Sequence, residues 1–356
     1  LILDVTDPWN PVYVGSENNN YCHDSYVRDN FLYTSDIYNG QFSIYDISNL
    51  SSPVLQATQL TPGLFNHNTW LSDDGRTLFA ADEKANEPLA SFDISDFGNI
   101  SLLDTFYNGN FTSNEVHNVR VINDYVICPS YGSQLTIVDG ARPRNMIEVA
   151  NYPTGGYLCW DADPYTTSGV IIATDMTGIF YVFEPVYQRA CYLEGIVTDS
   201  VTGTTLNGVE VAILGTGIIA QTNPLGEFYT GYADAGTYSI TFTKAGYISQ
   251  NSSFIFQNGV VDTIRVKLVP IGTGISDLPM SEMVVYPNPA TDKLFITTTF
   301  EECDFRVFDA LSKQVLNGQL SGSEKIIETK NLPSGTYTVE LSNGLQKAVQ
   351  QILINK

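Results

Sequence analysis

The three histidines of this chain are its first candidates for chemistry, and they occur in similar short phrases. The phrases are Tyr21-Cys22-His23-Asp24, Asn66-His67-Asn68 and Val116-His117-Asn118, and the histidines lie 44 and 50 residues apart. A fourth phrase, Cys159-Trp160-Asp161, keeps the acid but has tryptophan in place of histidine. Imidazole and carboxylate groups bind divalent ions, so these phrases predict a polar or metal-binding cluster wherever the fold brings them together.

The segments that follow each phrase indicate how the histidines are positioned. Short β-branched or alternating runs, such as residues 31–34 and 42–48, are separated by Asn, Asp and Gly, as in antiparallel strands joined by tight turns. Four such strands in a unit of about 40 to 50 residues are typical of a propeller blade. We therefore predict an all-β chain in which residues 1–186 form β-propeller blades. The first residues match the third strand of a repeat, so we expect further blades and a signal peptide upstream.

In a propeller, the histidines would begin inner strands of successive blades and meet at one mouth of the central channel. The predicted channel-mouth cluster comprises His23, Asp24, His67, Asn68, His117, Asn118 and Asp161, with Asp82 and Glu83 as further acidic contributors. One interpretation is a site for a divalent cation, the candidate cofactor. The other is structural: each histidine hydrogen-bonds a turn and locks blade to blade, and Asp82-Glu83 is an exposed acidic turn. Repetition in every blade favours the structural interpretation, because repeats copy architecture.

Several of these phrases resemble a known family. Tyr21 to Asp24, residues 66–75, Val116 to Val119 and residues 168–175 occur in the order seen in LVIVD-repeat propellers, in particular the choice-of-anchor B proteins. The resemblance spans residues 1–186. It implies a surface propeller whose members vary in their anchor and have no well-established activity. The phrase Cys159-Trp160-Asp161 departs from the family, which has a small residue before the tryptophan.

Beyond residue 186 the pattern changes. Residues 191–270 contain about seven short alternating strands with Gly, Asn and Pro turns, which predicts a small β-sandwich. The phrases Gly195-Ile196-Val197-Thr198-Asp199 and residues 222–228 make it similar to carboxypeptidase regulatory-like domains, which are usually spacers. Small polar residues over 271–284 predict a linker.

Residues 285–356 form the last predicted domain, and its motifs are the most specific in the chain. They closely resemble the C-terminal sorting domain of type IX secretion substrates in Bacteroidetes-like bacteria. The matching motif residues are Tyr286, Pro287, Asn288, Pro289, Pro333, Gly335, Tyr337 and Lys356. The resemblance implies export across both membranes of a Gram-negative cell. It also implies recognition of residues 285–356 by the type IX translocon and its outer-membrane shuttle, and usually removal of the domain afterwards.

The composition narrows the functional classes further. The net charge is −22, and residues 1–186 hold 23 Asp and Glu against 6 Lys and Arg. Such a surface repels nucleic acid and anionic membranes, so neither is an expected partner. We expect no transmembrane segment, because no apolar run approaches the roughly 18 residues that a membrane helix needs. The five cysteines are an odd number and widely spread, which does not indicate a disulfide framework, and Cys22 and Cys159 are expected to be buried free thiols.

The combined prediction is a secreted protein of the outer cell surface that acts in binding, adhesion or display, with a surface glycan or protein as ligand. The sequence contains no nucleophile elbow, P-loop or His-Glu-x-x-His motif, which favours a role other than catalysis. The alternative is a metal-dependent hydrolase or lyase with its site at the channel mouth. A third view is that the chain matters chiefly as secretion cargo.

Overall fold

The computed structural model describes residues 1–17, 20–107, 115–132, 134–155, 158–271, 283–322, 325–343 and 347–356. The chain is all-β, and the only helical element within those ranges is a single 3-10 turn, η1 (Ile37–Asn39). Residues 1–270 form one compact unit and residues 271–356 form a second. Most of the predicted linker, residues 272–282, lies outside the described ranges.

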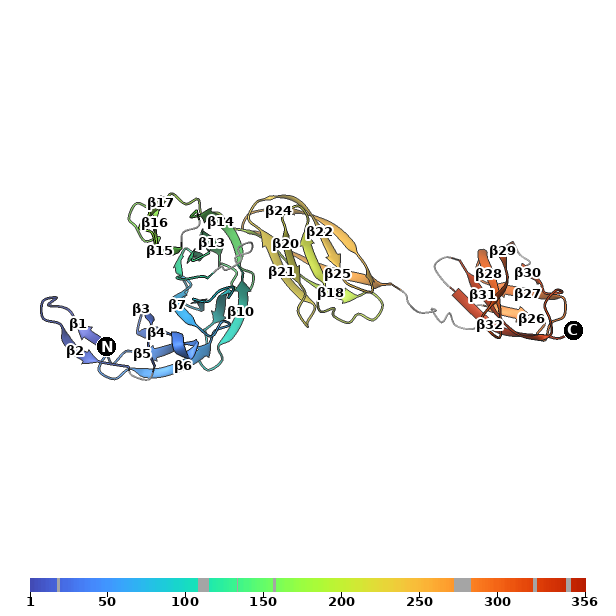
Figure 1. Ribbon diagram of the computed structural model, residues 1–356, viewed down its shortest axis with the longest axis horizontal. Coiled ribbons are helices and arrows are strands. Elements are labelled where there is room, and N and C mark those ends of the chain that lie inside the picture. Colours follow the sequence, from blue (N-terminus) through green and yellow to red (C-terminus); the bar gives the residue numbers. More distant parts are fainter. Residues whose placement is uncertain are drawn as a thin grey trace. The chain divides into compact units, whose positions relative to one another are not determined.

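The first part of the larger unit consists of successive antiparallel sheets, arranged as an arc that does not close (Figure 1). A two-stranded sheet comes first, three four-stranded sheets follow, and a three-stranded sheet comes last. Their strands are β1 (Ile2–Asp4) and β2 (Val12–Gly15); β3 (Asp24–Arg28), β4 (Phe31–Asp36), β5 (Gln41–Asp46) and β6 (Val54–Leu60); β7 (Asn66–Leu71), β8 (Thr77–Asp82), β9 (Leu89–Asp93) and β10 (Ser101–Phe106); β11 (Arg120–Ile122), β12 (Tyr125–Ser130), β13 (Gln134–Asp139) and β14 (Ile147–Pro153); and β15 (Cys159–Asp163), β16 (Ile171–Asp175) and β17 (Phe180–Phe183). These sheets are the predicted propeller blades. In each four-stranded blade the strands follow chain order from the inside of the arc to its rim (Figure 1).

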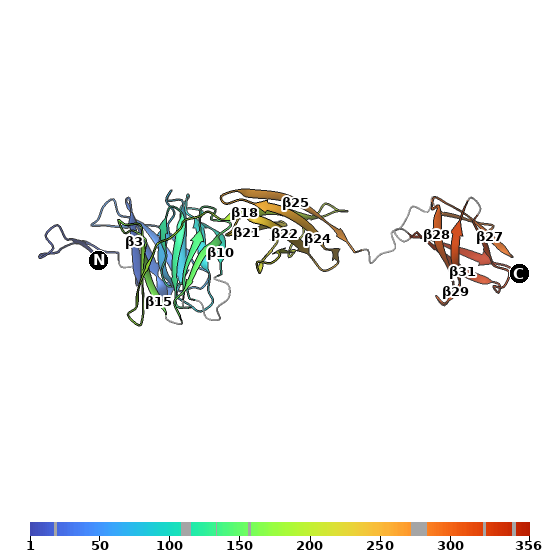
Figure 2. The same ribbon diagram turned by 90° about the horizontal axis from the view of Figure 1, so that it is seen from above.

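The blades are held together by apolar side chains that pack between neighbouring sheets. Phe42 of the first four-stranded blade meets Phe92 of the next with ring centroids 5.3 Å apart and nearly perpendicular rings. Phe79 in turn shares a buried cluster with Val119 and Val126 of the third. The strands stack side by side when seen from above (Figure 2). Because each core lies between two blades, the inner strands of adjacent blades are brought close together.

Residues 191–270 form a sandwich of two four-stranded sheets, with strand orders β21-β18-β25-β23 and β20-β19-β22-β24. The strands are β18 (Cys191–Asp199), β19 (Glu210–Ile213), β20 (Ile218–Gln221), β21 (Glu227–Tyr232), β22 (Gly236–Thr243), β23 (Tyr247–Ile248), β24 (Gln250–Phe256) and β25 (Val261–Pro270). Phe228 and Phe242 from opposite sheets meet in its core at 5.7 Å. The first and last long strands, β18 and β25, run parallel.

Polar side chains join the third blade to the sandwich. Arg142 pairs with Glu194 through two parallel hydrogen bonds of 2.8 Å. Asp139, fully buried, accepts hydrogen bonds from the Arg189 guanidinium at 2.6 Å and from the Ala190 backbone N–H at 2.8 Å. We call these groups the blade–sandwich interface. They explain why both parts belong to one compact unit.

The second unit is another two-sheet sandwich, with orders β26-β27-β30 and β29-β28-β31-β32. Its strands are β26 (Met283–Tyr286), β27 (Lys293–Thr298), β28 (Glu302–Asp309), β29 (Gln314–Ser321), β30 (Lys325–Glu328), β31 (Gly335–Ser342) and β32 (Lys347–Ile354). Its first strand therefore begins two residues before the predicted domain start at 285. All five cysteines are free, and Cys22 is exposed, so the prediction of buried thiols is wrong at that position.

Candidate functional site

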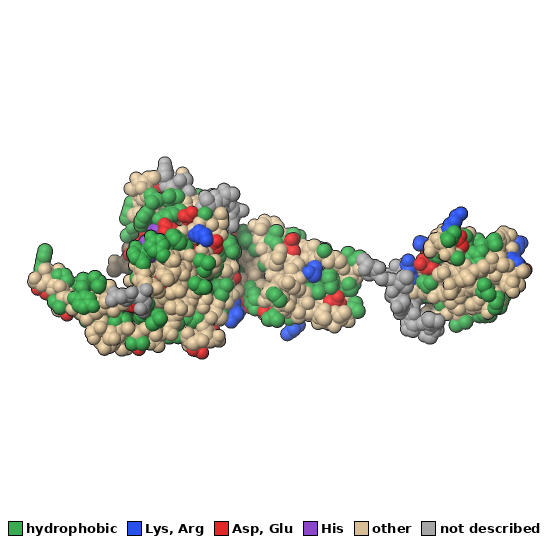
Figure 3. Space-filling model, turned by 60° about the horizontal axis from the view of Figure 1, so that its bottom comes forward, with side chains coloured by type: hydrophobic (Ala, Val, Ile, Leu, Met, Phe, Trp, Pro, Cys, Tyr) green, Lys and Arg blue, Asp and Glu red, His purple; other side chains and the backbone are tan. Residues whose placement is uncertain are grey.

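The three histidines meet between the inner strands of three consecutive blades. His23 and His67 approach each other with their Nε2 atoms 2.8 Å apart. Glu83 joins them from the end of β8, with its carboxylate oxygens 3.7 Å from His67 Nε2 and 3.8 Å from His117 Nε2. One ligating atom from each of His67, Glu83 and His117 lies within 4.8 Å of the other two. We call His23, His67, Glu83 and His117 the histidine cluster. Histidine reaches the surface beside acidic and apolar side chains in Figure 3.

A β-bulge positions His67. The pairing of β7 with β8 shifts register between Asn66 and Asn68, so His67 is the extra residue on its strand. A bulge re-aims one side chain locally, and bulges are frequent beside functional sites. Trp160 occupies the same place in the last blade, between the register positions Cys159 and Asp161. The bulge therefore explains why the repeated phrase presents this particular side chain to the mouth.

Asp82 and Glu83 are neighbours with different roles. Asp82 is buried and its carboxylate accepts hydrogen bonds from Thr61 Oγ1, from the backbone N–H of Gly63 and from that of Phe65. It fixes the turn that precedes β7 and does not join the histidine cluster. Glu83 is directed to the histidines, and its backbone N–H donates to the Phe65 carbonyl at 3.2 Å. The structure thus brings in only one of the two predicted acidic contributors.

Aromatic rings enclose the third histidine. His117 stacks on Tyr131 with centroids 4.4 Å apart and lies 4.9 Å from the Trp160 ring. Its Nδ1 is hydrogen-bonded to the Trp160 carbonyl oxygen at 2.5 Å. Sequence analysis did not assign Tyr131 to the site. Tyr131 lies in the phrase Ser130-Tyr131-Gly132, which occurs once in the sequence, so the repeat pattern did not point to it.

Burial disfavours the charged form of the ionisable groups here. It lowers the pKa of His67 to about 4, and the neighbouring His23 adds to the effect. The pKa of His117 is also lowered, first by burial and then by His67. Burial raises the pKa of Glu115, and the Glu83 carboxylate raises it further. The His67 and His117 imidazoles are therefore neutral near pH 7, which is the form that binds metal ions.

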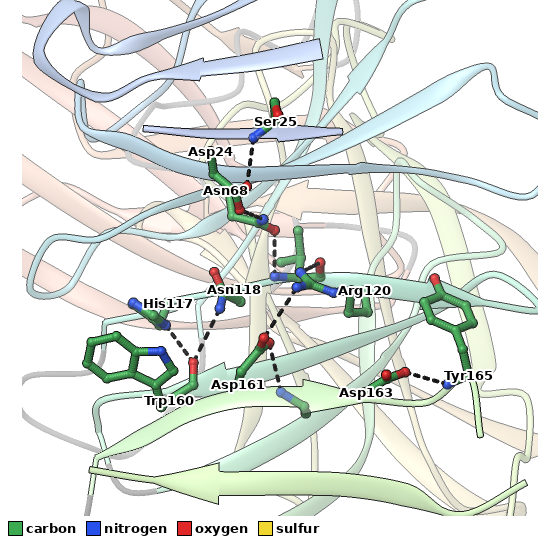
Figure 4. Close-up of polar contacts among 12 residues, drawn as sticks. Asp24, Ser25, Asn68, His117, Asn118, Arg120, Trp160, Asp161, Asp163 and Tyr165 are labelled. Carbon is green, nitrogen blue, oxygen red and sulfur yellow. Dashed lines mark hydrogen bonds and ion pairs between the residues drawn. The ribbon is translucent and has the colours of Figure 1, made fainter. Parts of the chain in front are cut away.

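The residues one position beyond each histidine form a second network (Figure 4). Asn68 donates to the Asp24 carboxylate at 2.5 Å and accepts from the Val119 backbone N–H at 2.9 Å. Asn118 Nδ2 donates to the Trp160 carbonyl at 3.3 Å. These contacts tie neighbouring blades together, and the Trp160 carbonyl, which also bonds His117 Nδ1, connects the network to the histidine cluster.

Asp161 belongs to the same network. Its carboxylate pairs with Arg120 at 3.3 Å, and the guanidinium lies 4.8 Å from the centroid of the Trp70 ring. Arg120 was not among the predicted residues, and nothing in the repeat pattern points to it. The predicted group of seven thus divides: the histidines converge with Glu83, whereas Asp24, Asn68, Asn118 and Asp161 link the blades.

The predicted sorting-motif residues hold the C-terminal strand in place. Asn288 accepts a hydrogen bond from the Leu353 backbone N–H at 2.8 Å, and Lys356 Nζ contacts Asp292 at 3.1 Å. The Tyr337 hydroxyl donates to the Pro333 carbonyl at 3.0 Å. Gly335 begins β31, Pro287 and Pro289 flank Asn288, and Tyr286 stacks on Phe295 at 5.7 Å.

Residues 284–355 match the family model described as the secretion system C-terminal sorting domain. The chain carries a type IX secretion sorting domain. Residues 21–61 match the LVIVD repeat, in agreement with the blade that they form. The sorting domain directs export to the cell surface or beyond. Within the ranges that the structure covers, no helix is long and apolar enough to cross a membrane.

Comparisons over the whole chain gave distant structural likenesses. A search of curated proteins gave no match. Among solved structures, the chain is similar to the WD40 β-propeller domain of Doa1, with 10% identity, a TM-score of 0.36, and coverage of 96% of this chain and 95% of that one. A protein from Lactobacillus plantarum is 13% identical with a TM-score of 0.37, and the match covers 85% of this chain and 86% of that one. The computationally designed Ika4 protein is 8% identical with a TM-score of 0.37, and the match covers 48% of this chain and 94% of that one. All three TM-scores are below 0.5. The resemblances to choice-of-anchor B proteins and to carboxypeptidase regulatory-like domains stay predictions.

Proposed function

We propose that this protein binds a glycan at the outer cell surface through the mouth of its propeller blades. The observation that carries the proposal is a row of aromatic rings at the mouth. Tyr38 and Tyr21 lie 5.2 Å apart, Tyr21 and His23 lie 6.4 Å apart, and the row continues through the other histidines to Trp160.

The exposure of the rings at both ends of this row supports a binding role. Tyr38 is 76% exposed, Tyr21 is 56% exposed and Trp160 is 44% exposed. Aromatic rings that carry polar tips and lie at the surface are costly to leave in water and are typical of binding sites. A sugar offers an apolar ring face for stacking and hydroxyl groups for hydrogen bonds, which suits rings set beside imidazoles and carboxylates.

The sorting domain supports the cellular location that we propose. Export by the type IX system would present the mouth outside a Gram-negative cell, with the translocon and the outer-membrane shuttle as partners of residues 285–356. Residues 191–270 would act as a spacer between the blades and that signal.

The binding role is tested on a glycan array with the full chain. The double variant Tyr38→Ala/Trp160→Ala is expected to lose binding at least about tenfold, since stacking contacts contribute roughly 1 kcal/mol or more each. Trp9→Ala is the matched control, because Trp9 is 90% exposed but belongs to the turn between β1 and β2. Equal affinity of the double variant and the wild type for the glycan would contradict the proposal. If the wild type binds a protein and no glycan, the proposed ligand class is wrong.

The export role is tested separately in the producing cell. Deletion of residues 284–356 is expected to abolish protease sensitivity of the protein on intact cells. Surface exposure that survives the deletion would show that another signal is sufficient.

The convergence of Glu83 with three imidazoles also favours a second candidate, metal-dependent hydrolysis or elimination of a surface polysaccharide or peptide. Turnover that is lost in His67→Ala would support this candidate over a role in binding alone.

A further inference from the structure

We infer that the histidine cluster binds one divalent late-transition-metal ion, with zinc as the prototype, through His67, His117 and Glu83, and with His23 as the fourth ligand. All of the histidines in the chain belong to this one cluster. The inference is independent of glycan binding and of export, because it concerns only the coordination chemistry of these four side chains.

The hydrogen bond of His117 carries the argument. A carbonyl oxygen can only accept, so the 2.5 Å contact with the Trp160 carbonyl places the proton of the neutral ring on Nδ1. The Nε2 atom then presents a lone pair. It faces the Glu83 carboxylate oxygen at 3.8 Å, so two electron-rich atoms point into the same space. A cation between them removes this repulsion and uses both as ligands.

His67 also places a ring nitrogen near a Glu83 oxygen. Its Nε2 lies 3.7 Å from the other oxygen of Glu83 and 2.8 Å from His23 Nε2. Two neutral imidazoles can share only one proton between facing nitrogens, so this contact leaves no N–H to donate to the Glu83 oxygen. The His67 side chain is 7% exposed, so water has little access to replace the missing partner.

The outer contacts of these rings suit metal ligands. A ligating histidine usually donates its second ring N–H to a carbonyl or carboxylate, which fixes the tautomer. His117 does this with the Trp160 carbonyl. His67 Nδ1 and Asn118 Oδ1 are both buried without a hydrogen-bond partner, and the Asn118 side chain lies close enough to the His67 ring to raise its pKa against the larger lowering by burial. A small rotation of the amide would pair this donor with this acceptor.

The spacing suits a tetrahedral ion. Zinc–nitrogen bonds of about 2.0–2.1 Å place neighbouring ligand atoms about 3.3 Å apart. The observed separations of 3.7 and 3.8 Å around Glu83 are slightly wider, and the His23 to His67 separation of 2.8 Å is slightly narrower. His23 is an exposed residue in the segment before β3, so its ring has room to adjust.

The donor set selects the class of metal. Three imidazole nitrogens and one carboxylate suit Zn²⁺, Co²⁺, Ni²⁺ or Cu²⁺, whereas Ca²⁺ and Mg²⁺ prefer oxygen ligands alone. The ligands come from three different blades, so bound metal would also cross-link them. Since such an ion binds only the folded state, it raises the unfolding temperature.

The test uses the full chain after removal of metal with a chelator. Isothermal titration is expected to show one Zn²⁺ per chain, and Co²⁺ is expected to give the intense visible bands of a four-coordinate site. Both ions are expected to raise the unfolding temperature, and Ca²⁺ and Mg²⁺ are not.

Substitutions decide whether the ion occupies this site. His67→Gln is expected to weaken Zn²⁺ binding by more than about 100-fold, and Glu83→Gln, which preserves shape, by at least about tenfold. Asp93→Asn is the matched control, because the Asp93 carboxylate accepts hydrogen bonds from Ser95 at the end of β9 and the variant should bind Zn²⁺ normally. Circular dichroism is used to check that each variant is folded. If His67→Gln does not fold, Glu83→Gln still tests the site. The inference is overturned by substoichiometric binding of both ions, by unchanged affinity in folded His67 or Glu83 variants, or by equal binding of Ca²⁺.

Discussion

The histidine cluster and the blade–sandwich interface are both polar sites built from several elements, yet their hydrogen bonding differs. At the interface, the Asp139 carboxylate accepts from Arg189, Ala190 and Ala141. In the cluster, by contrast, His67 Nδ1 is buried without a partner. Buried polar groups that are fully paired are typical of structural roles, and each unpaired one calls for an explanation such as a missing ion. The difference separates a fully paired interface, which is expected to serve stability, from a cluster that we propose to bind an ion.

The largest effect on the free energy of unfolding is expected at the centre of the blade–sandwich interface. Asp139→Ala should lower the free energy of unfolding by about 3–5 kcal/mol, because it leaves a partly buried guanidinium and two backbone N–H groups without their acceptor. Denaturant titration measures the loss. Glu328→Ala is the control, since its pair with Lys293 is exposed on both sides and should contribute less than about 1 kcal/mol. A loss at Asp139 no larger than this control would remove the distinction between the two sites.

A smaller effect is expected for Arg142→Met. The change removes the two hydrogen bonds to Glu194, whose side chain is 15% exposed. Because Arg142 itself is 41% exposed, the expected loss is about 1–2 kcal/mol. It should also speed proteolysis between residues 184 and 190, where the blades join the sandwich. Arg144→Met, in the same loop, is expected to leave the cleavage rate unchanged.

For the histidine cluster, the expected effect on stability without metal is close to zero. His67→Leu removes a buried polar ring with an unpaired nitrogen and replaces it with an apolar side chain, so the unfolding free energy should change by less than about 1 kcal/mol. Thermal unfolding in chelator measures this. A loss as large as that predicted for Asp139→Ala would mean that the histidines are mainly structural.

The last expected effect depends on pH and concerns Asp199→Asn in the sandwich. Backbone N–H groups of Thr202 and Val201 donate to the Asp199 carboxylate and lower its pKa below the usual 3.8. The lowered pKa contributes stability above pH 3.8 that is lost as pH falls through the folded value. The variant should therefore lose less stability than the wild type in that acid range. Identical acid unfolding curves would argue against this contribution.

The strand pattern and the sorting motifs were predictable because both are local in sequence. Alternation and Asn, Asp and Gly turns indicate strands, and the all-β fold with propeller blades confirms that prediction. The sorting domain matches a family model over residues 284–355 because its phrases are contiguous.

The composition of the histidine cluster was only partly predictable. Successive side chains on a strand point to opposite faces, so Asn118 and Asp24 could have been separated from the adjacent histidines, and Asp82 from Glu83. The bulge at His67 could not be predicted, since a register shift depends on how β7 pairs with β8. The same holds for Arg120, whose partner Asp161 is supplied by the next blade.

The parallel pairing of β18 with β25 has a mechanical consequence. Eight residue pairs, from Tyr192 with Val261 to Asp199 with Leu268, connect the strand by which the chain enters the sandwich to the strand by which it leaves. A pull that drags the blades one way and the chain after residue 270 the other way would load all of these pairs in shear at once, instead of opening them one by one. The paired strands β18 and β25 would therefore make the sandwich resist extension when force is applied across it.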